Sequence, residues 1–336
     1  MSPARTLVRA LADPGSTAVL DAAGWTTLLT IARAEQLIGS LAHRLHGLAT
    51  PPEVARILAA AHAAAEAGRT AALWEAEMAR RALASLGVPV VLLKGTAYVA
   101  AGLAAGQGRL IGDLDLLVPA PALAVVEAGL IGAGWEWVKA DAYDDAYYRR
   151  WMHELPPLIH AGRDRMADVH HTILPPTARR TPDAGALIAD AVPLGNSLSV
   201  LCPEDMVVHA ALHLFADGDL AGGLRNLWDI DRLLREFADA PGFWSGLEVR
   251  ARRHQALAPV RRAARQAHAL YDTPVPDDWR REDMADPLHR RRLLARDGWG
   301  RPTRPATRLA FYIRSHWLRM PPAMLARHLW TKWRRP

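Results

Sequence analysis

The chain has 336 residues, of which 50% are hydrophobic and 23% are charged, so it can bury a sizeable core and is not expected to be disordered. Its single cysteine, Cys202, excludes an internal disulfide framework and a cysteine-rich metal site. The formal net charge of +6 favours anionic partners, and a nucleoside triphosphate, a nucleic acid or an acidic lipid surface would each satisfy it.

Residues 1–86 are predicted to form an N-terminal helical region. Alanine-rich stretches such as Ala59–Ala65 have high helix propensity, and Pro51-Pro52 indicates the start of a new segment. The stretch Thr70–Leu86 is amphipathic, with leucines and a methionine interspersed among glutamates and arginines.

The beginning of the chain does not have the pattern of a secretion signal. Asp13 interrupts the short apolar stretch around Arg5 and Arg9. The chain also lacks a run of about 18 apolar residues without charge. We therefore expect no signal peptide, no membrane-spanning helix and a cytoplasmic location.

Residues 87–200 are predicted to form a core of strands and helices. Helices are expected over 97–105 and 120–133, and Gly162–Arg165 favours a hairpin turn. Because some strands are linked by helices and others by a hairpin, we expect an α+β fold with a small mixed sheet. The stretches that favour strands are Val88–Leu93, Asp113–Val118, Trp135–Lys139, Leu155–His160 and Met166–Ile173.

A polar linker is expected from Pro175 to about Asn196. After it, residues 201–336 are predicted to form a C-terminal helical region that ends in a basic tail. Pro203 followed by two acidic residues is typical of a helix start, since proline suits the first turn and acids suit the positive helix end.

Two acidic residues stand two positions apart at the start of a predicted strand. Side chains two apart on a strand point to the same face, so Asp113 and Asp115 would project together, about 6.5–7 Å apart at the backbone. Converging carboxylates are ligands for Mg²⁺, and without a cation they would repel each other. The alternative is that they are solvated acids at the end of a strand.

Asp168 is a third candidate, on the predicted strand after the hairpin. If this strand lies beside the strand of Asp113, the three acids share one edge of the sheet. Three carboxylates can hold two metal ions about 3.5–4 Å apart, and Asp168 could also accept a proton from an acceptor hydroxyl. Alternatively, Asp168 pairs with Arg163 or Arg165 of the hairpin.

The segment Lys94-Gly95-Thr96 joins a predicted strand to a helix. Gly95 would let the backbone approach a phosphate, Thr96 adds a hydroxyl, and the helix start supplies donors. Lys94 could balance phosphate charge or simply be solvated. Arg109 stands four residues before Asp113 and could reach the same phosphates.

A predicted strand is followed by Lys-Gly-Thr, a helix and the string Arg-x-x-Gly-Asp-Leu-Asp-Leu-Leu-Val. This order resembles the DNA polymerase β-like nucleotidyltransferase superfamily, and most closely its uncharacterised bacterial branch. The positions of Gly95-Thr96, of Asp113 with Asp115 and of Asp168 match in order, with threonine where the superfamily has a serine. The resemblance covers roughly Val88 to Leu234. Further segments that resemble the branch are Arg109-Leu110-Ile111-Gly112, His153-Glu154-Leu155-Pro156, Asp168-Val169-His170 and Leu224-Arg225-Asn226-Leu227-Trp228-Asp229.

The resemblance implies that Gly112, His170, Arg225 and Asp229 lie near the nucleotide. His170 has the strand parity of Asp168, and it either orients a substrate or packs. Arg225 and Asp229 are four apart on a predicted helix, so an ordinary ion pair is the alternative. His209 and His213 lie one helical turn apart, but a third ligand is missing, so packing or capping is favoured over zinc binding.

We therefore predict a nucleotidyltransferase that uses Mg²⁺, with Mn²⁺ as an alternative, held by Asp113, Asp115 and Asp168. It would move a nucleoside monophosphate from a triphosphate, ATP by default, to an acceptor and release pyrophosphate. A small-molecule acceptor is favoured over a protein side chain or an RNA end, because no RNA-binding module is recognisable. The alternatives are a non-catalytic nucleotide- or partner-binding protein and, less consistent with the single strand before the acids, a glycosyltransferase.

The C-terminal tail is strongly basic. From Arg301 to Pro336 it contains nine Lys or Arg and no Asp or Glu, with tryptophans interleaved. Such a segment can bind an anionic membrane surface, which would place the protein peripherally at a membrane, or a nucleic acid. The alternative is a helix packed back on the protein with its basic side solvated.

Overall fold

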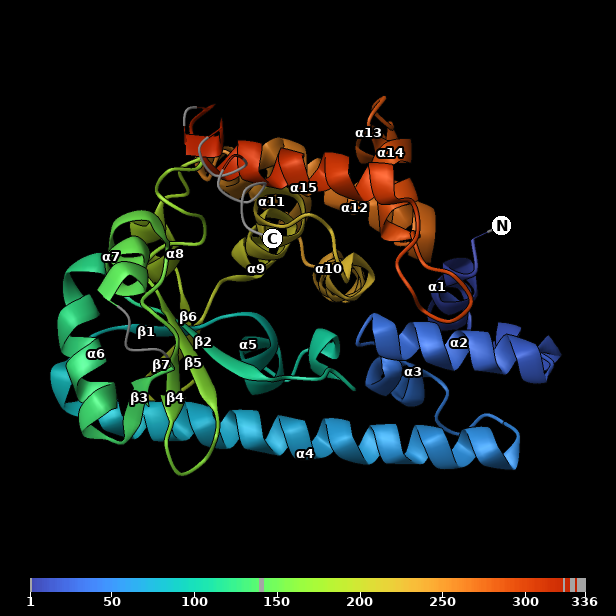
Figure 1. The fold of residues 1–336 in the computed structure, drawn as a ribbon, viewed down its shortest axis with the longest axis horizontal. Helices are drawn as coiled ribbons and strands as arrows, with labels where there is room; N and C mark the ends of the chain where they lie inside the picture. The colour runs from blue at the N-terminus through green and yellow to red at the C-terminus, as the bar shows by residue number, and fades with distance from the viewer. Residues whose placement is uncertain (1, 139–141, 323, 327–329, 331–336) are drawn as a thin grey trace.

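The computed structural model describes residues 2–138, 142–322, 324–326 and 330. Its centre is one sheet with the strand order β3-β4-β5-β2-β1-β7-β6, flanked by helices, which confirms the expected α+β fold with a mixed sheet (Figure 1). The strands are β1 Val90–Leu92, β2 Asp113–Leu117, β3 Trp135–Trp137, β4 Leu158–His160, β5 Met166–His170, β6 Val192–Pro193 and β7 Leu198–Val200.

The central strands β2 and β5 are parallel neighbours, and their register places Asp115 opposite Asp168. Strand β1 is antiparallel to β2 and parallel to β7, so the sheet is mixed. The predicted hairpin joins β4 and β5, which are antiparallel. Asp164 in its turn has a φ of 52°, a left-handed conformation that aspartate tolerates better than most residues. The sequence prediction that the two acidic strands are adjacent is thus confirmed.

The N-terminal region is helical, as predicted. Helix α4, Pro52–Leu83, has 32 residues, which corresponds to about 48 Å at the usual helical rise. It packs against α3 at one end and against α5, α6 and β2 further along, so it lies under both the small helices and the sheet (Figure 1). The helices before it are α1 Ala4–Ala12, α2 Ala22–Ala34 and α3 Ile38–Arg44.

The core contains two helices that were not predicted, α7 (Ala142–Trp151) and α8 (Ala184–Ala189). Helix α8 and strand β6 lie within the segment 175–196, so the prediction of a plain polar linker there was wrong. Asp183 caps α8 by accepting a hydrogen bond from the backbone of Ala186, which explains how a polar segment starts a helix. The predicted strand over 135–139 ends at Trp137, and Lys139 lies outside the described residues. The core helices are α5 Lys94–Ala100, α6 Leu123–Gly132, α7 Ala142–Trp151 and α8 Ala184–Ala189.

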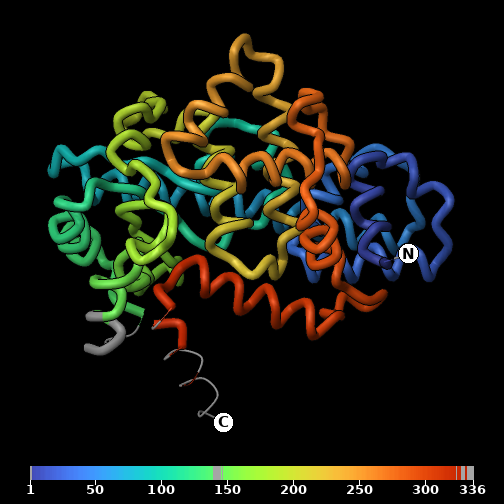
Figure 2. Tube along the Cα trace, turned by 90° about the horizontal axis from the view of Figure 1, so that it is seen from above, coloured from blue at the N-terminus to red at the C-terminus, as the bar shows by residue number. Residues whose placement is uncertain are grey.

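The C-terminal region is helical, as expected, and packs beside the sheet and against the N-terminal helices (Figure 2). The buried apolar residues form a cluster that runs continuously from Ala4 in α1 through the sheet to Phe311 in α15. The division at 86/87 and 200/201 stays a sequence-based prediction. The helices are α9 Pro203–Leu212, α10 Gly223–Phe237, α11 Phe243–Arg253, α12 Leu257–Tyr271, α13 Asp277–Arg280, α14 Asp286–Leu293 and α15 Pro305–Arg319, and the π-helical turn η5 His213–Asp217 follows α9.

The first part of the basic tail forms α15 and packs back on the protein. Phe311 is buried, and Thr177 donates a 2.6 Å hydrogen bond to the carbonyl oxygen of Arg319. The outer face of α15 exposes Leu309, Ile313 and Trp317, which leaves these side chains accessible to a partner. Binding of the tail to an anionic surface stays a prediction. No helix within the described ranges is both long and apolar enough to cross a bilayer. Trp333 and the basic residues beside it lie outside the described residues.

Candidate functional site

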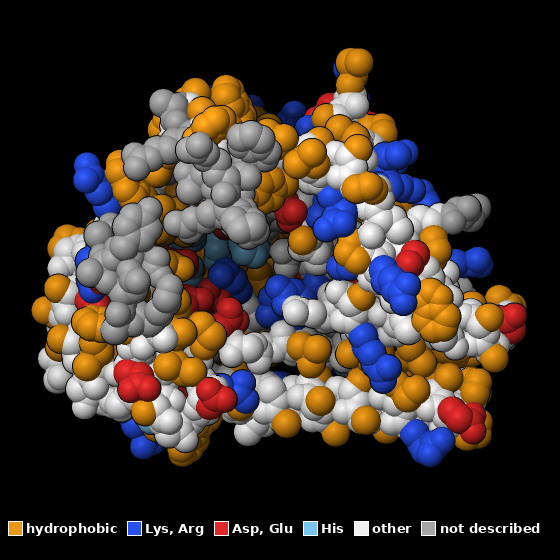
Figure 3. Space-filling model, in the orientation of Figure 1, with side chains coloured by type: hydrophobic (Ala, Val, Ile, Leu, Met, Phe, Trp, Pro, Cys, Tyr) orange, Lys and Arg blue, Asp and Glu red, His pale blue; other side chains and the backbone are white. Residues whose placement is uncertain are grey.

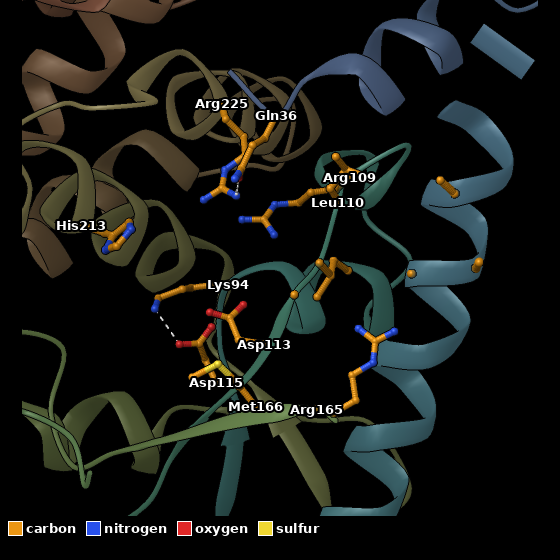
Figure 4. A pocket seen from close by; sticks show the side chains of 15 residues that line it. Gln36, Lys94, Arg109, Leu110, Asp113, Asp115, Arg165, Met166, His213 and Arg225 are labelled. Atoms are coloured by element: carbon orange, nitrogen blue, oxygen red, sulfur yellow. Dashed lines mark hydrogen bonds and ion pairs between the residues drawn. The ribbon is translucent and has the colours of Figure 1, made fainter. Parts of the chain in front are cut away.

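A cleft of about 910 Å³ opens where the amino ends of β2 and β5 and the carboxyl end of β1 meet α4 and α10. Acidic, basic and histidine side chains gather around a hollow near the centre of the face drawn in Figure 3. The close view shows Asp113, Asp115 and Lys94 on one side of the cleft and Arg109 and Arg225 on the other (Figure 4). The residues that line it are Gln36, Ala64, Ala67, Gly68, Lys94, Arg109, Leu110, Ile111, Gly112, Asp113, Asp115, Arg165, Met166, His213 and Arg225.

The three predicted acids converge beside this cleft: Asp113 and Asp115 line it, and Asp168 lies next to them without lining it. Asp113, Asp115 and Asp168 each offer a carboxylate oxygen, and these oxygens lie within 4.8 Å of one another. Asp113 is exposed at the start of β2, whereas Asp115 is only 2% exposed. Burial and repulsion by Asp115 and Asp113 raise the pKa of Asp168 to about 6. Oxygen donors that crowd and repel one another in this way fit a hard divalent cation.

The alternative for Asp168, an ion pair within the hairpin, is not what the structure contains. Arg163 instead makes two hydrogen bonds of 2.8 Å to Glu75 of α4. Arg165 lines the cleft. The hairpin arginines therefore fasten the sheet to α4 and contribute to the cleft, and the structure brings Asp168 to the other two acids.

Asp115 is held in its ionised form by two neighbours. Lys94 Nζ lies 2.6 Å and His170 Nε2 lies 2.9 Å from the same oxygen, Oδ1. Burial alone would raise the pKa of Asp115, but Lys94 and His170 outweigh it and lower the pKa far below its usual range. For Lys94, burial acts to lower the pKa, while Asp115, Asp113 and Glu154 raise it above its ordinary value. Lys94 is thus a cation committed to Asp115.

The backbone of Lys94 is in an unusual conformation at this point. Its φ is +50°, in the left-handed region that residues with a Cβ rarely adopt. Helix α5 begins at Lys94, so this turn swings the side chain from the end of β1 toward Asp115 on β2. Such strain, of order 1–3 kcal/mol, tends to be retained where it positions a functional group.

His170 lies behind Asp115 and does not line the cleft, which corrects its expected place beside the nucleotide. It is 2% exposed, stacks on the ring of His153 at 5.2 Å, and has Nδ1 3.3 Å from Glu154 Oε2. The parallel register explains the difference, because His170 is level with Leu117, one pleat deeper than Asp168. Its role toward the site is to hold Asp115.

Gly95 and Thr96 are buried and do not line the cleft, so the expected phosphate-binding role of this turn stays a prediction. The Thr96 hydroxyl donates to the backbone oxygen of Asp113 at 3.4 Å. Gly95 is required for a different reason: a Cβ at this position would lie 1.9 Å from Nη1 of Arg109. Thr96 therefore holds the start of β2, and Gly95 leaves room for the guanidinium of Arg109.

Arg109 is fixed by groups on three sides. Its Nε donates to Asp229 at 3.0 Å, its guanidinium lies over the ring of Tyr98 at 5.6 Å, and Gly95 makes room for it. Both partners of the ion pair are almost completely buried. Burial raises the pKa of Asp229 despite the opposing effect of Arg109 and Arg225. Asp229 therefore positions Arg109 at the cleft wall, and it lies behind that wall instead of facing the main cleft.

Arg225 lines the cleft, and the alternative of an ion pair between Arg225 and Asp229 is not how the structure arranges them. Arg225 Nη1 donates to Gln36 Oε1, in the segment after α2.

Gly112 also lines the cleft, and no heavy atom lies within 4 Å of where its Cβ would be. His213 lines the cleft, whereas His209 is buried, so the two do not form a zinc pair there.

Several lining residues could not be recognised from the sequence. Gln36 and the small residues of α4, Ala64, Ala67 and Gly68, come from the N-terminal helical region. They have no motif, because they serve the cleft only through packing between segments far apart in the chain. Arg165 has one signal in the sequence, its place in the hairpin before Asp168, but that place indicates a partner for the acid and not a residue of the cleft.

Comparison with known proteins identifies the family of the chain. A comparison with curated proteins finds no match. The model of a family described as "Uncharacterised nucleotidyltransferase" matches residues 21–272, a range that contains all the cleft residues named above. The match extends beyond the core into the N-terminal and C-terminal helices, which agrees with their contribution to the cleft. The chain therefore belongs to this family of uncharacterised nucleotidyltransferases, and the general activity of its class is nucleotidyl transfer.

Proposed function

We propose that the protein transfers a nucleoside monophosphate from a nucleoside triphosphate to an acceptor oxygen, with Mg²⁺ as its cation and pyrophosphate as the second product. The observation that supports this most is the distribution of charge across one cleft. Carboxylates of Asp113 and Asp115 line one side, and Arg109 and Arg225 line the other. A triphosphate with its cation has the matching polarity, because the cation faces carboxylates and the phosphates face guanidinium groups.

Asp113, Asp115 and Asp168 fit Mg²⁺ because their oxygens converge to within 4.8 Å and Mg²⁺ takes carboxylate oxygens together with substrate phosphates. When bound, Mg²⁺ would neutralise charge that develops on the phosphates and polarise the α-phosphate. Mn²⁺ accepts the same ligands and is the expected substitute. On Asp115, the hydrogen bonds from Lys94 and His170 both reach Oδ1, so its orientation is set before substrate binds.

In the proposed reaction, the acceptor oxygen forms a bond to the α-phosphorus, and the bond from that phosphorus to the bridging oxygen of pyrophosphate breaks. Where the acceptor is a hydroxyl, Asp168 takes its proton. Without a cation, burial and the neighbouring acids raise the pKa of Asp168 to about 6. Mg²⁺ beside the carboxylate would lower that pKa, so Asp168 would be ionised at neutral pH and able to accept the proton. Arg109 and Arg225 hold the phosphates, and most of the rate gain comes from positioning and charge stabilisation.

We propose a small molecule as the acceptor and ATP as the default donor. The cleft has a volume of about 910 Å³, which lies within the range of small-molecule sites, about 300–1,000 Å³. Side chains from α4, α10 and the hairpin surround it, so a nucleotide and a compact acceptor can be enclosed together. A protein side chain or an RNA end is the alternative acceptor, and a binding-only protein is the alternative function.

The test is incubation of the protein with each α-labelled nucleoside triphosphate, Mg²⁺ or Mn²⁺, and a cell extract. We expect label to enter one extract component and pyrophosphate to be released only when the cation is present. Asp113→Ala and Asp115→Ala should abolish both signals. Asp277→Ala is the control, because the Asp277 side chain is 92% exposed and pairs with Arg280 on its own helix.

Pyrophosphate release that is unchanged in the two acid variants would overturn the assignment of these residues. Cation-dependent binding of a triphosphate with no labelled product in any extract would instead favour the binding-only alternative. The chemical identity of the labelled product, separated into small-molecule, protein and RNA fractions, decides the acceptor class.

A further inference from the structure

A second group of metal-ligand residues lies directly behind Asp115. His153, Glu154 and His170 each offer a donor atom, and these atoms lie within 4.8 Å of one another. None of the three lines the cleft that contains the acids. His153 is 8% exposed and His170 is 2% exposed, so the imidazoles are buried. The group is therefore separate from the proposed Mg²⁺ ligands, although His170 touches one of them.

The backbone around this group is fixed by the sheet. Glu154 forms an isolated antiparallel bridge with His170, so the segment that precedes β4 runs along the end of β5. The backbone N–H of His171 donates to the carbonyl oxygen of His153 at 2.9 Å, and that of Leu155 donates to Val169 at 2.9 Å. The donors thus converge because two paired backbone segments present them, and not through chance orientation of surface side chains.

The hydrogen-bond pattern of His170 shows that its second nitrogen needs a partner. Nε2 lies 2.9 Å from the carboxylate of Asp115, so this nitrogen carries the hydrogen. In the neutral ring, Nδ1 then presents a lone pair, yet it lies 3.3 Å from another acceptor, Oε2 of Glu154. Within the described part of the chain, Nδ1 of His170 has no hydrogen-bond partner. Buried acceptors that face each other require a positive charge between them.

A metal ion accounts for this geometry better than a proton does. A proton shared by His170 and Glu154 would satisfy that contact, but it would leave Nε2 of His153 3.9 Å from the same Glu154 oxygen, too far for a hydrogen bond. Ligands at about 2.0–2.2 Å from a tetrahedral ion are separated from one another by roughly 3.3–3.6 Å. The separations of 3.3 Å and 3.9 Å lie close to this range, so small side-chain movements would complete the site.

We propose that Nε2 of His153, the carboxylate of Glu154 and Nδ1 of His170 form a site for one divalent transition metal, with Zn²⁺ as the ion that suits the donor set. Two imidazoles and one carboxylate are a known ligand combination for zinc, with water in the fourth position. Mg²⁺ does not suit it, since that ion prefers oxygen donors. This site is additional to the acid cluster and does not depend on the proposed reaction.

The site has a consequence for the cleft. A metal on Nδ1 of His170 fixes the tautomer in which Nε2 carries the hydrogen, and that hydrogen bond holds Asp115. His170 would therefore connect the two centres, as a metal ligand on one side and a positioning residue for Asp115 on the other. The cleft acid would be oriented by a buried metal that never contacts substrate.

The first test is metal content. Wild-type protein is equilibrated with Zn²⁺, desalted in an excess of Mg²⁺ to occupy oxygen-donor sites, and analysed for zinc. We expect about one zinc per chain. His153→Gln and Glu154→Gln should lower the Zn²⁺ affinity roughly tenfold or more. His171→Gln and Asp113→Asn should keep it, because His171 Nε2 faces the carbonyl oxygen of Met152 and Asp113 belongs to the other cluster.

The second test uses only the wild-type chain, so it does not depend on how the variants fold. Co²⁺ substitution should give the intense visible absorption of a tetrahedral site with nitrogen ligands, and Zn²⁺ should displace it. Zinc-free wild-type protein after desalting, or equal zinc in Glu154→Gln and wild type, would overturn the proposal. A weak octahedral Co²⁺ spectrum that Mg²⁺ abolishes would overturn it as well, because it would place the ion on the acids.

Discussion

Gly95→Ala is expected to disrupt the cleft wall although it replaces no charged residue. The added Cβ would lie 1.9 Å from Nη1 and 2.9 Å from Cζ of Arg109, so the guanidinium must move. Moving it breaks the buried 3.0 Å ion pair with Asp229, which leaves a carboxylate buried without its partner. Breaking a pair of this kind costs about 3–5 kcal/mol, and we expect the free energy of unfolding to fall by about 3 kcal/mol.

The measurement is equilibrium urea unfolding of the variant beside Gly132→Ala. Gly132 is the last residue of α6, and its Cβ would meet no heavy atom within 4 Å. That control should change the free energy of unfolding by less than about 1 kcal/mol, in the stabilising direction, because alanine favours a helix. A Gly95→Ala protein as stable as the wild type would refute the close packing of Arg109 on Gly95.

A double-mutant comparison isolates the cause. In an Arg109→Ala background the clashing atoms are gone, and the nearest remaining contact of the new Cβ is Cγ1 of Ile111 at 3.1 Å. Gly95→Ala should then cost no more than about 1 kcal/mol, because the two substitutions act on the same interaction. A cost of about 3 kcal/mol in both backgrounds would show that Gly95 matters for a reason other than Arg109.

Three further predictions address the cleft, a buried histidine and the tail. Arg225→Ala should weaken triphosphate binding in calorimetry by roughly tenfold, through loss of a charge-assisted contact, while Arg252→Ala, an exposed residue on α11, should not. Burial lowers the pKa of His289 to about 4, below its usual value of 6.5, so the folded protein favours the neutral imidazole. The unfolded chain therefore binds the proton more readily, and about 2–3 kcal/mol of unfolding free energy should be lost as the pH falls from 6.5 to 4. The free energy of unfolding of the His289→Phe protein should change less with pH over this window. An unchanged pH dependence would show that groups other than His289 cause the loss. More of the wild type should co-sediment with anionic vesicles than of a variant with serine at the exposed α15 residues Leu309, Ile313 and Trp317. Equal co-sedimentation of the two proteins, or binding to RNA alone, would contradict a lipid partner for these residues.

The acid cluster could be predicted because it depends on local rules. The spacing of Asp113 and Asp115 places both on one strand face, and the hairpin before Asp168 indicated a neighbouring strand. The structure brings the three carboxylates together as expected, while their catalytic roles stay predictions. Strand parity also grouped His170 with Asp168, but parity does not say how deep a residue lies along the sheet.

The cationic side of the cleft could not be predicted from local spacing. Arg225 and Asp229 are four residues apart, and this spacing favours an ion pair on one helix. In the structure Asp229 instead accepts a hydrogen bond from Arg109, which is 120 positions away in the sequence. Gln36 meets Arg225 across 189 positions. Contacts of this range arise from the packing of α2, α5 and α10 around the sheet, and no periodicity encodes them.

The central claim is that the acids and arginines of one cleft together bind a nucleoside triphosphate with its cation. It is tested most directly by calorimetric titration of the protein with a non-hydrolysable ATP analogue, with and without Mg²⁺. We predict binding that requires Mg²⁺ in the wild type and in Asp277→Asn, and that is lost in Asp113→Asn and Asp115→Asn. Equal affinity with and without Mg²⁺, or binding that survives in both cleft variants, would contradict the claim.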